Sequence, residues 1–260
     1  FFFVLFLVFA CVVGPAEGGG GDAGVTGGRT RALPLSLQAE QAAQRFVSEA
    51  RAFADDLMIT QATAMLGHTQ LATGQHDAAR STFQQAMAMA QRSGLRVIIT
   101  SCLVGLGNLE LALSHLPEAQ RLDEQTFVVV QPGTNETWKP PAALVGLGRI
   151  ALSQGRPDDA LAHFRQTLSA PVRSAATTAE ALVYAAEALV QQGDLAQPAE
   201  VCSFLLSWPG APYSVKMLAR RLVDDIEDRM LPEELAIVLG HQWQLEDVVA
   251  QIVRPTTACT

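Results

Sequence analysis

Basic residues are scarce in this sequence of 260 amino acids. Lysine and arginine together number 18 against 26 aspartates and glutamates, so the formal net charge is −8 at pH 7. Most of the affinity of a protein for DNA or RNA comes from basic side chains that neutralise phosphates. An acidic chain with so few of them is not expected to contact nucleic acid directly.

Cysteine is also rare, and its four positions lie far apart: Cys11, Cys102, Cys202 and Cys259. Cysteines scattered so far apart fit neither a disulfide framework nor the C-x-x-C pairs of a structural zinc site. Neither pattern is present, so reduced and buried thiols are expected. The five histidines form no H-x-x-x-H or H-E-x-x-H pair, and the sequence therefore predicts no metal and no cofactor.

Long apolar runs are missing as well. The longest unbroken one extends from Phe1 to Val13, which is short of the roughly 20 residues that a membrane-spanning helix needs. A glycine-rich stretch over residues 18–28 follows, with the composition of a flexible linker. We expect residues 1–33 to be a leader outside the folded part, either disordered or an artefact of a fragmentary start. A secretory signal or membrane anchor is the alternative if a Met and basic residues precede it.

From Leu35 onward, apolar residues recur three and four positions apart, and glycine and proline stand at the junctions. This spacing predicts an all-α fold. A set of small and aromatic residues also repeats: Leu66-Gly67, Gly74, Ala79, Phe83 and Ala86 return 81 residues later as Leu147-Gly148, Gly155, Ala160, Phe164 and Thr167. Two weaker copies begin at Leu106-Gly107, where Asp123 replaces the aromatic residue, and at Ala185-Ala186.

These positions resemble tetratricopeptide repeats, which are helix-turn-helix units marked by Leu-Gly in the first helix and by small and aromatic residues in the second. The resemblance implies a right-handed α-solenoid of helical hairpins over residues 34–206. Small side chains would let the two helices of a hairpin approach closely, while Phe83 and Phe164 would fill the space toward the next repeat.

Residues 207–260 depart from the repeat spacing, and we expect them to form a helical cap. Their phrase Leu231-Pro232-Glu233-Glu234, followed by Leu245-Glu246-Asp247-Val248-Val249, is similar to the tails of large bacterial transcriptional regulators of the LuxR-like and SARP-like kinds. In those regulators a signal-transduction ATPase module precedes such repeats. The charged residues of the cap, with Arg220 and Asp224, and Arg221 and Asp225, at helical i, i+4 spacing, indicate a solvated face.

One motif is typical of a dinucleotide-binding site, but its context favours a role in helix packing. Gly146-Leu147-Gly148-Arg149-Ile150-Ala151 matches the dinucleotide fingerprint G-x-G-x-x-A, which requires a strand before it and a helix after it. Pro140-Pro141 precede it, and Gly105-Leu106-Gly107 repeats it 41 residues upstream. The repetition favours a packing role. Since no nucleophile with a nearby base and no Walker loop is present either, the sequence predicts no enzymatic activity.

The remaining candidate site is the concave groove. The resemblance implies that the residue after the small position of each first helix faces this groove, which gives a column of His68, Asn108, Arg149 and Glu187. Flanking groove positions are Gln61, Ser101, Glu180 and Tyr184. Stacked repeats would align these side chains and offer donors, acceptors and both charge signs to an extended peptide. Exposed polar residues without a ligand are the alternative interpretation.

The sequence therefore predicts a non-enzymatic protein–protein interaction and regulatory module. By resemblance, it is the sensor arm of a larger cytoplasmic bacterial transcriptional regulator, with signal transduction as its role. Its partner would be a protein or peptide in the groove, including an upstream ATPase domain of the same polypeptide. The alternative is an exported or membrane-tethered repeat protein that acts as an assembly scaffold.

Overall fold

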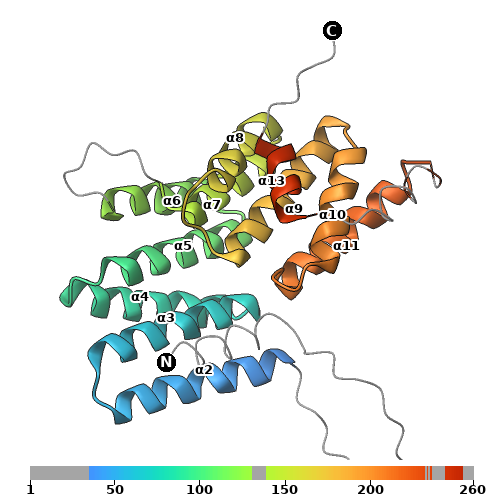
Figure 1. Cartoon of the computed structure of the whole chain (residues 1–260). Helices are drawn as coiled ribbons and strands as arrows, with labels where there is room; N and C mark the ends of the chain where they lie inside the picture. The colour runs from blue at the N-terminus through green and yellow to red at the C-terminus, as the bar shows by residue number, and fades with distance from the viewer. Residues whose placement is uncertain (1–34, 131–138, 232, 234, 236–243, 254–260) are drawn as a thin grey trace, which may run out of the picture. The chain divides into compact units, whose positions relative to one another are not determined.

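The computed structural model describes residues 35–130, 139–231, 233, 235 and 244–253, and within these ranges every regular element is an α-helix (Figure 1). The all-α helical-repeat class predicted from the sequence is confirmed. The predicted leader, residues 1–33, lies outside the described residues. So do most of the segment between Leu231 and Leu245 and the last residues, 254–260.

The chain divides into two compact units, residues 1–105 and 106–260, and the boundary falls inside helix α5. Three helices and the first part of α5 make up the described part of the first unit: α2 (Leu35–Ala52), α3 (Asp56–Ala72), α4 (His76–Arg92) and α5 (Arg96–Ala112). Helix α3 packs against both α2 and α4. The apolar and alanine spacing over residues 37–58 predicts a single helix, and this prediction is wrong. Helix α2 ends at Ala52, and the Asp55 carboxylate caps α3 by accepting from the backbone N–H groups of Leu57 and Met58.

In its described residues, the second unit continues from α5 with six helices in tandem, α6 to α11, and then α13. They are α6 (Leu116–Val130), α7 (Pro141–Ser153), α8 (Pro157–Leu168), α9 (Ala175–Gln192), α10 (Ala196–Ser207), α11 (Tyr213–Glu227) and α13 (Leu245–Val253). Each of the helices α6 to α11 packs against the next, and α9 also contacts α7 and α11. Thus α7, α9 and α11 are neighbours in one layer of this unit. Helix α13 packs against α8, α9 and α10.

The repeated glycines make room for side chains of the second helices. A Cβ atom at Gly67 would lie 2.8 Å from the Phe83 ring of the same hairpin, and a Cβ at Gly105 in the next helix would overlap the other end of that ring. Phe83 is fully buried. The ring is therefore held between two backbones. A Cβ at Gly148 would likewise meet the buried ring of Phe164. The packing role predicted for these glycines is confirmed.

The pair of glycines in each G-x-G follows from this arrangement. In Gly146-Leu147-Gly148, the second glycine faces Phe164 of its own hairpin, whereas the first faces Asp123 of the preceding one. One glycine thus makes room for a side chain of α8, and the other makes room for a side chain of α6. Within the described residues the motif lies in a helix with no strand before it, so it is not built as a dinucleotide site.

Asp123 occupies the aromatic position of the α5–α6 hairpin and is 2% exposed. A Cβ at Gly107 would lie 2.7 Å from its Oδ1, and a Cβ at Gly146 would overlap its Oδ2. The carboxyl group is therefore enclosed between the two glycine backbones, where Phe83 and Phe164 stand in other hairpins. Burial raises the pKa of Asp123 to about 8, against the opposing effect of the Arg149 guanidinium.

Candidate functional site

The eight positions predicted to line the groove are all half-buried, and they lie on helices α3, α5, α7 and α9. Several of them contact one another across neighbouring helices of the same unit. Partner binding by these residues stays a prediction.

In the first unit, His68 of α3 and Ser101 of α5 are hydrogen bonded, with 3.0 Å between His68 Nε2 and Ser101 Oγ. The imidazole packs edge-on against Phe83, with 4.8 Å between ring centroids. Burial lowers the pKa of His68 to about 4, although a hydrogen bond with the backbone of Ser101 acts in the opposite direction. At neutral pH the ring is therefore uncharged. Gln61 lies two turns before it on α3, also half-buried.

In the second unit, Arg149 of α7 connects the predicted positions on either side of it. Its Nη1 donates a hydrogen bond to Asn108 Oδ1 of α5 at 2.6 Å. Its guanidinium carbon lies 4.9 Å from the ring centroid of Tyr184 on α9, which is within the range of a cation–π contact. The Tyr184 ring in turn stacks on Phe164, with centroids 6.3 Å apart. Three successive first helices thus contribute to one chain of contacts.

The positive charge of Arg149 also acts on two carboxylates of α9, Glu180 and Glu187. Burial raises the pKa of Glu180 and of Glu187, and the positive charge of Arg149 opposes that effect for both. Burial is the larger effect in each case.

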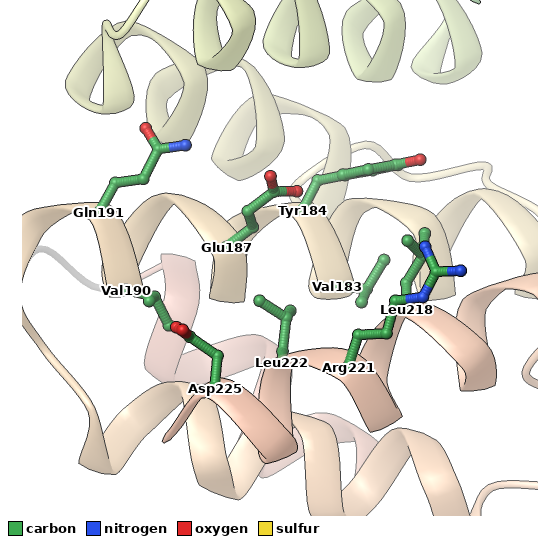
Figure 2. A pocket seen from close by; sticks show the side chains of 9 residues that line it. All are labelled: Val183, Tyr184, Glu187, Val190, Gln191, Leu218, Arg221, Leu222 and Asp225. Atoms are coloured by element: carbon green, nitrogen blue, oxygen red, sulfur yellow. The ribbon is translucent and has the colours of Figure 1, made fainter. Parts of the chain in front are cut away.

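Two pockets flank α9 in the second unit. The first has a volume of about 390 Å³ and is lined by Leu111, Arg149, Leu152, Ser153, Tyr184, Glu187 and Gln191. The second, of about 330 Å³, lies between α9 and α11 and is shown in Figure 2 with its lining residues: Val183, Tyr184, Glu187, Val190, Gln191, Leu218, Arg221, Leu222 and Asp225. Tyr184, Glu187 and Gln191 line both. We refer to these two pockets and the α9 face between them as the α9 groove.

The sequence interpretation missed the wall that α11 contributes. Arg221 and Asp225 were assigned to a solvated face, and both are exposed there; they also line a pocket, and Asp225 accepts from Arg229 at 3.2 Å. Leu218 and Leu222 form the apolar part of that wall. Their i, i+4 spacing was a usable signal, since it places both on one face of α11 beside Arg221.

Three structural features concern metal binding, thiol chemistry and membrane insertion. Among the described residues, no group of three or more His, Cys, Asp or Glu is placed to hold a metal ion. Cys102 and Cys202 are free and buried, as expected, and burial raises the pKa of each thiol to about 12. No helix in the described ranges is both long enough and apolar enough to cross a membrane.

Comparison with known families identifies the repeats. A tetratricopeptide repeat model matches residues 60–85 and 141–166. These stretches lie within the α3–α4 and α7–α8 hairpins, which carry the two stronger copies of the sequence pattern. A search of curated proteins finds no significant match to the chain. The chain therefore contains tetratricopeptide repeats, a kind of repeat that generally serves as a scaffold for binding proteins or peptides.

Proposed function

We propose that this chain is a non-enzymatic protein-interaction module whose second unit binds a polypeptide partner in the α9 groove. The observation that carries the proposal is the row of half-buried polar side chains on successive first helices, from Asn108 through Arg149 to Tyr184 and Glu187. Polar groups held in place beside two open pockets can recognise a ligand without first being ordered.

Partner contact in the groove is tested by site-specific photo-crosslinking. A photoreactive amino acid replaces Gln191, an exposed residue that lines both pockets, or Glu124, an exposed residue of α6. We expect polypeptides in an extract of the source cell to crosslink from position 191 and not from position 124. Equal crosslinking from both positions, or none from position 191, would contradict the proposal.

A charge-reversed variant supplies the second test. Arg149→Glu combined with Glu187→Lys exchanges the charges of the groove, and we expect it to weaken capture of the polypeptides that crosslink from position 191. Helicity measured by circular dichroism should be retained, because both side chains are only half-buried. Unchanged capture by a folded variant would remove these two residues from the binding surface.

The cellular role that we propose is the sensor arm of a larger cytoplasmic regulator of transcription. Its support is the tail similarity to LuxR-like and SARP-like regulators together with the repeats. In that setting, partner binding would relieve or impose restraint on an upstream ATPase domain. Sequencing the genomic DNA upstream of the codon for Phe1 tests this role, since an open reading frame for an ATPase domain supports it. An upstream Met with basic residues would favour the exported or membrane-tethered scaffold instead.

A further inference from the structure

A further groove lies beside helix α13, apart from the α9 groove. It has a volume of about 350 Å³ and shares no lining residue with the two pockets of the α9 groove. Leu168, at the end of α8, forms one apolar wall, and Leu245, Val249 and Val253 of α13 form the other. We refer to it as the α13 groove.

Helix α13 carries apolar residues on two sides. Val248 and Ile252 are buried and belong to the core of the second unit. Leu245, Val249 and Val253 follow one another at a spacing of four residues, lie at the edge of that core and are only half-buried. A helix that packs on one side needs a single apolar stripe. The second stripe therefore leaves apolar surface that a further neighbour could cover.

Two hydrogen bonds hold α13 in place against the helices on which it packs (Figure 1). Arg165 Nε of α8 donates to the carbonyl oxygen of Ile252 at 2.8 Å, and Gln251 Nε2 donates to Glu200 Oε2 of α10 at 2.9 Å. The half-buried stripe is therefore presented in a fixed position, and little conformational freedom remains to be lost when another surface covers it.

The charged lining of the α13 groove is one base and one acid, Arg173 and Glu246. Arg173 Nη1 donates to the carbonyl oxygen of Ala170 at 2.8 Å. No ion pair joins Arg173 to Glu246 within the part of the chain that the structure describes. An apolar stripe with one charge of each sign beside it is complementary to its own copy, because a two-fold axis brings each charge to the opposite charge of the other copy.

We propose that this chain associates with a second copy of itself through the α13 groove. The half-buried stripes of the two α13 helices pack together across a two-fold axis, and Arg173 of each copy pairs with Glu246 of the partner subunit. The inference goes beyond the proposed function, since none of these residues lines the α9 groove. A dimer of this kind carries two α9 grooves and would bind a partner with two matching segments more tightly than one copy does.

The test measures the mass of the full chain by sedimentation equilibrium at concentrations from roughly 1 to 300 µM. We expect the average mass to rise with concentration from 27.7 kDa toward twice that value. The dissociation constant should be on the order of micromolar, because a small groove indicates an interface at the low end of the usual size range. A mass that stays at that of one chain over the whole range would overturn the inference.

Charge exchange locates the interface. Glu246→Arg and Arg173→Glu, each alone, should raise the dissociation constant roughly tenfold, because each places like charges opposite one another. The double variant exchanges the two charges and should restore association to within about threefold of the natural chain. Asp247→Arg is the matched control: it makes the same change at the next residue of the first turn of α13, exposed and outside the groove, and should leave association unchanged.

Val249→Asp puts a charge into the apolar stripe and should also abolish the dimer, with folding checked by circular dichroism. If it does not fold, the charge variants at positions 173 and 246 still decide the result. Equal effects of Glu246→Arg and Asp247→Arg, or a double variant as weak as the single ones, would overturn the inference. Crosslinking from position 191 tests the α9 groove separately, so either proposal can fail without the other.

Discussion

Replacing Asp123 by asparagine should make the protein more stable at neutral pH than it is with its natural residue. The carboxyl group is enclosed between the backbones at Gly107 and Gly146. Asparagine has nearly the shape of the protonated carboxyl group and carries no charge at any pH. The substitution therefore keeps the packing and removes the titration, which isolates the effect of burying an ionisable group at this position.

The sign and size of the effect follow from the raised pKa. The pKa of Asp123 is about 8 in the folded protein, against about 3.9 in an unfolded chain. Between these values the folded state binds a proton that the unfolded state lacks, so the free energy of unfolding falls as the pH rises. The slope is at most about 1.4 kcal/mol per pH unit for one proton, which amounts to roughly 2 to 3 kcal/mol between pH 5.5 and 7.5. The loss is complete above pH 8.

Urea denaturation followed by circular dichroism at 222 nm measures this difference at pH 5.5, 6.5 and 7.5. We expect the stability of Asp123→Asn relative to the natural protein to increase at each step. Asp224→Asn, at an exposed position of α11, is the control and should follow the natural protein at all three values. If the natural protein and Asp123→Asn gave parallel curves, Asp123 would be ionised in the folded state and the reasoning from burial would be wrong.

The other predictions concern single positions. Gly148→Leu would force a side chain into the buried ring of Phe164 and should lower the free energy of unfolding by roughly 1 to 3 kcal/mol, and an unchanged melting temperature would refute the packing role. The pKa of His68, about 4, lies below its unfolded value of about 6.5, so its contribution to stability is present above pH 6.5 and is lost as the pH falls toward 4. His68→Gln should therefore lose less stability than the natural protein over that interval in the same denaturation assay, and an equal loss would show that the imidazole is not desolvated. Gly193→Ala should lower stability by about 1 kcal/mol, because residue 193 has a φ of +91° at the end of α9, and no loss on thermal unfolding would contradict the backbone argument.

The helical class and the glycine positions could be predicted because they depend on local spacing. Phe83 and Gly67, like Phe164 and Gly148, lie on the two helices of one hairpin, so their contact follows from the spacing within the repeat. The pattern failed at residues 53–55, where α2 ends and Asp55 caps α3, because a short break between two apolar helices does not change the three- and four-residue spacing.

The site was predicted only in part. The resemblance to the repeat family placed Arg149 and Tyr184 on the same face, but it did not show that they contact each other or that Arg149 binds Asn108. The α11 wall with Leu218 and Leu222 was missed altogether, since its sequence departs from the repeat and its charges indicated a solvated helix.

The amino-acid sequence by itself determined that this chain forms paired helices and where their backbones come close, because small residues at a fixed period leave room for a neighbouring helix. Only the tertiary structure decided which polar side chains are desolvated and which carboxylates lie under the influence of a guanidinium. Those properties depend on residues from different hairpins being brought together, as Asp123 is with Gly146 and Arg149 is with Glu187, and no spacing along one helix contains that information.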